Sequence, residues 1–152
     1  MLNIKLAPAL NDFTSTWEYE LLDDVKITVA GQQIVVPRMF SYDGASIPAL
    51  AWKLIYTPFD PIVMAPALVH DWLYSNHQVK KDDADTALKD LLLQNGVPGE
   101  KAAIIHRAVA WFGNEAWENK PNDIAYLKWL CTKLKAAGVD TRPYKFPPGT
   151  CT

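Results

Sequence analysis

The sequence has little cysteine: Cys131 and Cys151 are the two thiol residues in 152 residues. Two thiols are too few for a disulfide framework or for a zinc site built on thiolates. Cys131 lies within a helical pattern, which favours a place in the core over a reactive role. A reducing cytoplasm is therefore the expected compartment of synthesis.

Long apolar runs and an excess of charge of one sign are also absent. No apolar stretch reaches the roughly 18 residues of a membrane span, and the N-terminus lacks the basic and apolar regions of a signal peptide. The formal net charge is −2, with acids and bases interspersed, so no basic stripe indicates a nucleic-acid partner. Hydrophobic residues make up 49% of the chain, which predicts one globular domain over residues 1–152.

The order of the patterns predicts an α+β fold. Residues 1–14 have no clear period and are expected to form an irregular lead-in. Residues 15–48 alternate apolar and polar side chains and predict a small antiparallel β meander followed by a loop. Residues 61–137 carry helical periods, and the tail at 138–152 is rich in proline and glycine. We therefore expect a small N-terminal antiparallel β-sheet followed by a mainly helical C-terminal half.

Helix boundaries follow from the caps and breakers in the second half. The first helix is expected from about Val63 to Asn76, and the second from Asp82, a good N-cap residue, to Asn95-Gly96. A third opens after Pro98-Gly99 with an apolar stripe. The fourth is expected at residues 123–137, with Ile124 among its apolar positions.

One apolar stretch, Ala67 to Tyr74, contains three polar groups within two helical turns. In a helix, His70 and Tyr74 stand four residues apart and share a face, while Asp71 is rotated by about 100° from His70. Buried polar groups must find partners. The nearest carboxylates in the sequence are Asp43, Asp82, Asp83 and Asp85. This stretch is the candidate site.

Each candidate also has a structural interpretation. His70, Asp71 and Tyr74 can form a buried hydrogen-bond network, and Asp85 can stabilise the first turn of its helix. Asp43 can make an Asx turn, and Gly44 permits a close backbone approach. Ser46 is a poor nucleophile candidate because Gly44-Ala45-Ser46 is not a nucleophile elbow. His77 is expected in a loop and His106 on a helix surface. The tryptophans are expected mostly in the core, with Trp52, Trp72 and Trp111 as an alternative patch for a partner or a lipid.

Four motifs together resemble a family of phage and prophage proteins catalogued as a domain of unknown function, number thirteen fifty-three. The family pattern is a strand ending in V-P, a D-x-A-S-I-P loop, an H-D-x-L-Y helix, and a basic residue with A-D opening the next helix. The match covers about residues 15–117. Lys81 stands where the family favours arginine, so a bidentate role is not carried over. The resemblance implies a phage or prophage origin. The matching segments are Val36-Pro37, Asp43-Gly44-Ala45-Ser46-Ile47-Pro48, His70-Asp71-Trp72-Leu73-Tyr74 and Ala84-Asp85.

A local resemblance links His70-Asp71-x-x-Tyr74 and Asp85 to the active-site core of the phospholipase A2 enzymes. It implies His70 as the general base for a water molecule, Asp71 as a calcium ligand, and Asp85 as the orienting carboxylate held by Tyr74. The calcium loop of those enzymes is glycine-rich. The upstream loop here has one glycine, Gly44, and one carboxylate, Asp43, which would be the second metal ligand.

Two classes of function follow as expectations. One is a calcium-dependent, phospholipase-like hydrolase that acts on an ester or a lipid. The other is a non-enzymatic virion or tail-associated component in which His70, Asp71, Tyr74 and Asp85 only join helices. Its partners would be lipid or other phage structural proteins. Its location would be the host cytoplasm during synthesis and the virion afterwards.

Overall fold

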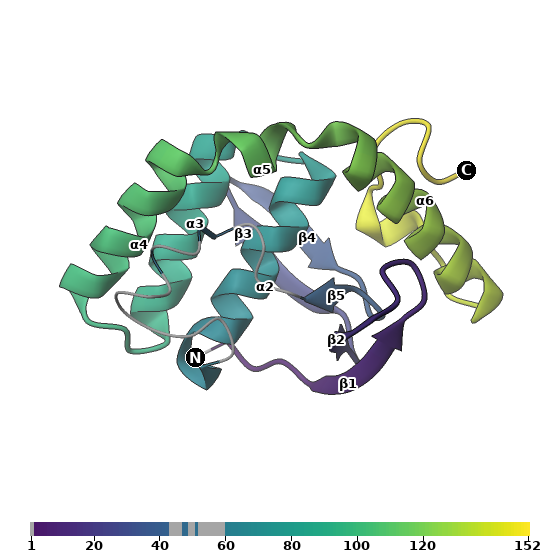
Figure 1. Ribbon diagram of the computed structural model, residues 1–152, viewed down its shortest axis with the longest axis horizontal. Helices are drawn as coiled ribbons and strands as arrows, with labels where there is room; N and C mark the ends of the chain where they lie inside the picture. The colour runs from purple at the N-terminus through teal and green to yellow at the C-terminus, as the bar shows by residue number, and fades with distance from the viewer. Residues whose placement is uncertain (1, 43–46, 49–50, 52–59) are drawn as a thin grey trace.

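The computed structural model describes residues 2–42, 47–48, 51 and 60–152, with residues 120–122 described by their backbone alone. Strands and helices are segregated along the chain, with the strands first, which confirms the expected α+β fold (Figure 1). Within the described residues the strands are β1 (Leu6–Asn11), β2 (Thr16–Leu21), β3 (Val25–Val29), β4 (Gln32–Val36) and β5 (Ser41–Tyr42). The helices are α2 (Pro61–Asn76), α3 (Lys81–Gln94), α4 (Gly99–Phe112), α5 (Asn114–Glu118), α6 (Lys120–Ala136) and the short 3₁₀ helix η1 (Arg142–Tyr144).

The expected antiparallel strands are confirmed, but they form two sheets, so residues 15–48 do not make a single meander. One sheet has the order β1-β2-β5, and β3 pairs with β4 in the other. The expected irregular lead-in in fact contains β1, which pairs with β2 so that Leu6 lies opposite Leu21. Pro8 obscured this strand in the sequence, but β1 is an edge strand, where a missing N–H is tolerated.

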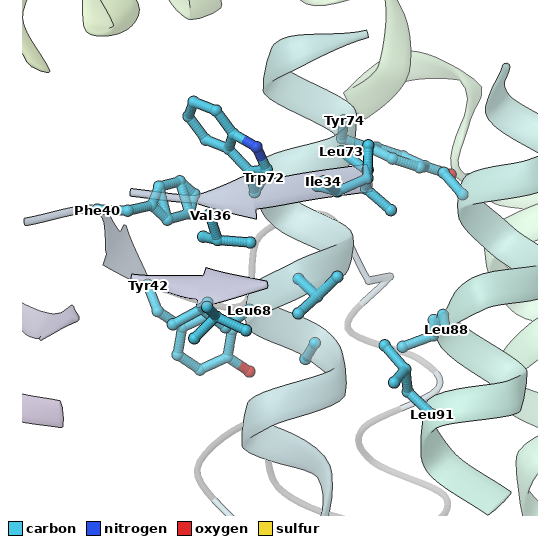
Figure 2. Close-up of a cluster of buried hydrophobic side chains, with 14 of the residues drawn as sticks. Ile34, Val36, Phe40, Tyr42, Leu68, Trp72, Leu73, Tyr74, Leu88 and Leu91 are labelled. Carbon is cyan, nitrogen blue, oxygen red and sulfur yellow. The ribbon is translucent and has the colours of Figure 1, made fainter. Parts of the chain in front are cut away.

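Helix α2 is the central element of the core. Its N-cap is Asp60, whose carboxylate accepts a hydrogen bond from Ile62 N at 3.0 Å, and this cap starts the helix two residues earlier than expected. The helix is buried on nearly every side. Figure 2 shows side chains of β4 and β5 on one side of α2 and Leu88 and Leu91 of α3 on the other. A helix surrounded in this way holds its polar residues away from water.

The other helices confirm most of the apolar pattern but not every boundary. α3 begins at Lys81, and its N-cap is Lys80 without a side-chain bond, so Asp82 is not the N-cap. Asp82 instead lies exposed in the first turn, where a carboxylate is favourable anyway. Ile124 was expected on the buried face of α6 but is 43% exposed. Among the residues of α4 and α6 whose side chains are described, the buried positions are Ala102, Ile105, Val109, Leu127, Leu130, Cys131 and Leu134.

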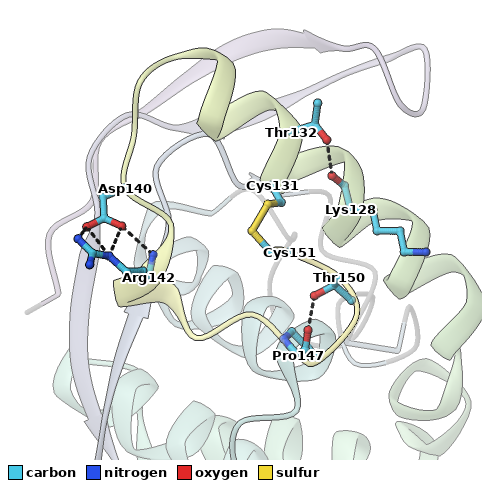
Figure 3. Close-up of a disulfide and its surroundings, with 8 residues drawn as sticks. All are labelled: Lys128, Cys131, Thr132, Asp140, Arg142, Pro147, Thr150 and Cys151. Atoms are coloured by element: carbon cyan, nitrogen blue, oxygen red, sulfur yellow. Dashed lines mark hydrogen bonds and ion pairs between the residues drawn. A yellow bond between two sulfur atoms is a disulfide. The ribbon is translucent and has the colours of Figure 1, made fainter.

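The C-terminal tail is fixed to the domain, partly by a covalent bond. Cys131 of α6 and Cys151 form a disulfide with their Cα atoms 5.6 Å apart (Figure 3). Tyr144 is buried, and the Asn76 side chain donates to its carbonyl at 3.1 Å. Sequence spacing could not reveal this pair because the tail must fold back first.

No helix in the described ranges is both long and apolar enough to cross a membrane.

Candidate functional site

The candidate site lies between α2 and α3, which a short connection joins into a helical hairpin. Nε2 of His70 lies 2.8 Å from Oδ1 of Asp85, and the Tyr74 hydroxyl donates to the same oxygen at 2.6 Å. The predicted approach of His70 to Asp85 is therefore confirmed. Because His70 and Tyr74 are one helical turn apart, a single carboxylate on the neighbouring helix can accept from both.

Lys81 occupies the second oxygen of the same carboxylate. Its Nζ donates to Oδ2 of Asp85 at 2.7 Å and to the backbone carbonyl of Val109 at 2.9 Å. The carbonyl of Val109 lies in the last turn of α4, where helices present carbonyl groups that favour a cation. Lys81 therefore ties α3 to the end of α4, and a bidentate arginine is not needed for this contact.

Burial and hydrogen bonding fix the charges of the cluster. Burial would raise the pKa of Asp85, but the hydrogen bonds from His70, Lys81 and Tyr74 outweigh it and hold that pKa below its usual value. Burial lowers the pKa of His70, against the pull of Asp85. Burial, and then the hydrogen bond to Asp85, raise the pKa of Tyr74. At neutral pH the cluster therefore holds an aspartate, a lysine cation, a neutral imidazole and a neutral phenol.

These charges determine the tautomer of His70. An ionised carboxylate only accepts hydrogen bonds, so the atom of His70 that faces Asp85 must carry the proton. We therefore assign the hydrogen to Nε2 and the lone pair to Nδ1. Lys81 already balances the charge of Asp85, so the imidazole has no need to be protonated. A neutral ring with an oriented lone pair is the form that a general base requires.

Asp71 lies on a different side of α2, as its rotation from His70 predicted. It is 8% exposed and, together with Tyr74 and Ser75, lines a cavity of about 1070 Å³. The other walls come from the β1–β2 hairpin, α5 and the start of α6. His70 is not among the described residues that line this cavity, so Tyr74 is the member of the cluster that reaches it.

The second predicted metal ligand cannot be placed in the same way. Asp43, Gly44 and Ser46 lie outside the described residues. Among the residues that the structure does describe, no group of three or more His, Cys, Asp or Glu side chains could hold a metal ion. Of the two predicted calcium ligands, Asp71 lies within the described residues.

The proposed aromatic patch is not formed by the residues expected to make it. Trp72 is fully buried in the core, whereas Trp111 is 68% exposed on α4. Trp52 lies outside the described residues. Two histidines lie near the positions that the sequence predicted. His77 follows α2 as its C-cap residue, and His106 is half-buried on α4.

Two residues near Tyr74 were not identified from the sequence. The ring of Trp117, on α5, packs edge-on against Tyr74 with centroids 5.1 Å apart and stacks on His77 at 3.7 Å. Gly113 lies between α4 and α5, where a Cβ atom would stand 2.7 Å from the Tyr74 hydroxyl and 2.4 Å from the carbonyl oxygen of Val109. No sequence signal distinguished this glycine from one that only ends a helix.

Gly113→Ala should lower the free energy of unfolding by about 1–3 kcal/mol, the usual cost of overpacking. The φ of Gly113 is −86°, which any residue adopts, so the cost is steric. The new methyl group would push the Tyr74 hydroxyl away from Asp85. Urea unfolding measures the loss, and Gly99→Ala is the control because no atom lies within 4 Å of a Cβ there. Equal unfolding midpoints for the two variants would contradict the prediction.

Comparison with curated proteins finds partial relatives in Sinorhizobium fredii (strain NBRC 101917 / NGR234). The protein named "Uncharacterized protein y4jT" is 33% identical over 78 residues, which are 51% of this chain and 23% of that protein. "Uncharacterized protein y4iH" is 31% identical over 71 residues, which are 47% of this chain and 30% of that protein. The match thus covers a minor part of each relative's own length. No solved structure matches the chain.

The family comparison covers the hydrogen-bonded cluster itself. Residues 19–109 match the family described as Protein of unknown function (DUF1353). This range includes His70, Tyr74, Lys81 and Asp85, while the cavity walls contributed by α5 and α6 lie beyond it. Because the match covers more than half of the 152 residues, the chain belongs to this family of proteins of unknown function.

Proposed function

We propose that this protein is a hydrolase in which His70 is the general base for an attacking water. The observation that carries the proposal is the convergence of His70 Nε2 and the Tyr74 hydroxyl on one oxygen of Asp85. The phospholipase A2 resemblance implies this same set of contacts. Asp85 acts as a positioning residue: it fixes the ring orientation and leaves the Nδ1 lone pair as the basic atom.

The reaction follows from the charges of the cluster. Nδ1 of His70 takes a proton from water while the water oxygen bonds to the carbonyl carbon of an ester. The resulting tetrahedral oxyanion collapses, the bond to the alcohol oxygen breaks, and the imidazolium returns its proton to that oxygen. Asp85 and Lys81 stay charged throughout, and the carboxylate stabilises the transient imidazolium at a distance of 2.8 Å.

Asp71 extends the proposal to a metal ion. Its carboxylate borders the cavity one residue from His70, the position from which a calcium ligand would act in a phospholipase-like site. Calcium bound there would polarise the ester carbonyl. Asp43 is the second proposed ligand, and its position lies outside the described residues.

Calcium should bind the native protein, release or absorb heat in a calorimetric titration, and lose that signal in Asp71→Asn. The amide keeps the size of the side chain but removes the charge that a hard cation needs. Asp23→Asn is the matched control, because Asp23 is exposed between β2 and β3. Hydrolysis of p-nitrophenyl acetate and of phosphatidylcholine vesicles is measured with calcium and with EDTA. A folded native protein with no calcium heat would remove the metal from the mechanism.

A structural role is the second candidate, and two observations favour it. His70 is fully buried, and the cluster joins α2, α3 and α4 through Asp85 and Lys81. In that case the protein would be a phage virion or tail-associated component, with the network serving only to hold its helices together. The two candidates differ in what His70→Gln does, as set out in the Discussion.

A further inference from the structure

We propose that the cavity beside Tyr74 binds an organic cation joined to an apolar group, with Asp123 of α6 as its counter-ion. The inference rests on the proposed function, because it names the class of substrate for the same site. A cavity of about 1070 Å³ is slightly larger than the roughly 300–1,000 Å³ of most small-molecule sites. It is large enough for a substrate that reaches Tyr74 with one end while its cationic end lies toward α6.

The charges around the cavity all have one sign in the described part of the chain. Carboxylates enter it from several elements, whereas none of its described lining residues is a lysine, arginine or histidine. These carboxylates would repel an anionic ligand and attract a cation. The lining carboxylates are Glu18 on β2, Asp71 on α2, Glu115 and Glu118 on α5, and Asp123 on α6.

Aromatic rings supply the second half of the recognition. Phe40, Phe112 and Tyr126 line the same cavity as the carboxylates. Phe112 is 63% exposed, so its ring is available to a ligand. Ring faces attract an ammonium or guanidinium group and also cover apolar carbon. Rings and carboxylates together therefore select a ligand that has both a positive charge and an apolar body.

Asp123 is the carboxylate best suited to pair with the cation. It is half-buried, and burial alone raises its pKa to about 6. No described side chain makes a hydrogen bond or an ion pair with it. The charged groups that share its cavity, Glu18, Asp71, Glu115 and Glu118, are acids and do not offset this cost. A bound cation would lower the pKa of Asp123, so binding should strengthen as the pH rises through 6.

The test uses isothermal titration of the full chain with benzyltrimethylammonium, whose charge does not change with pH. Benzyl alcohol and benzoate are the neutral and anionic comparisons. We expect the cation to bind more tightly than both, and about tenfold more weakly at pH 5 than at pH 7.5, following the ionised fraction of a group with a pKa near 6. Equal binding of the three compounds would overturn the proposal.

Two variants assign the effect to Asp123. Asp123→Asn should bind the cation about tenfold more weakly at pH 7.5 and lose the pH dependence, while Asp23→Asn should keep both. An Asp123→Asn variant that binds as the native protein does would overturn the assignment. Binding is repeated on His70→Gln, because His70 does not line the cavity among the described residues. Cation binding without hydrolysis would contradict the proposed function alone, and hydrolysis without cation binding would contradict this inference alone.

Discussion

His70→Gln should keep the fold and lower the rate of ester hydrolysis by a factor of about 10² or more, the usual worth of general acid–base catalysis. Glutamine nearly fills the volume of the ring and can still donate to Asp85, but it has no basic nitrogen. Hydrolysis and urea unfolding must be measured on the same samples. His106→Gln is the control, because it changes the same residue type at a half-buried position of α4.

If the cluster only holds the helices together, we expect the opposite pair of results. Neither protein would hydrolyse esters or lipids with calcium present, and His70→Gln would lower the free energy of unfolding by about 1–3 kcal/mol through an unsatisfied partner.

The pH profile of hydrolysis is a further test of His70 as the general base. Because burial lowers the pKa of His70 from 6.5, activity should be lost only as the pH falls below 6.5, when the ring gains a proton.

Lys81→Met should lower the free energy of unfolding by about 3–5 kcal/mol, the cost of leaving one partner of a buried ion pair alone. The side chains of Lys81 and Asp85 are 13% and 2% exposed, so solvent screens the pair little. Methionine keeps the length of the side chain and removes the charge. Without the cation, the pKa of Asp85 should rise, because burial is then opposed by neutral donors alone.

Urea unfolding at pH 7 measures this loss, and Lys80→Met is the matched control because Lys80 is exposed. The double variant Lys81→Met/Asp85→Asn should recover part of the stability, since the amide removes the unpaired charge. A Lys81→Met protein as stable as the Lys80→Met control would show that the buried pair contributes nothing to stability.

The sequence predicted the helical half and the central contact because both depend on local information. Apolar spacing located α2, α3, α4 and α6, and a short connection between two helices implied that they pack side by side. Once His70 and Tyr74 share a face, a carboxylate on the next helix is their nearest partner. These facts left several acidic residues as candidates, and the phospholipase A2 resemblance singled out Asp85, which contacts both side chains.

The features that were missed depend on contacts between distant segments. β1 is a strand because β2 pairs with it, and its own sequence does not alternate clearly. Gly113 is constrained by Tyr74, a residue of another helix. Asp123 has a raised pKa because of the cavity around it, which no spacing in the sequence could reveal. Local patterns predicted elements, whereas tertiary packing determined the pocket.

The disulfide between Cys131 and Cys151 closes the end of the chain into a covalent ring. Tyr144 and Phe146 belong to this ring, and Phe146 packs edge-on against Trp72 of α2 with centroids 5.7 Å apart. A peptide bond broken anywhere between residues 132 and 150 would therefore leave both fragments attached to one molecule. The disulfide would keep the severed piece in place after such a cut, and a reductant would leave it held by non-covalent contacts alone.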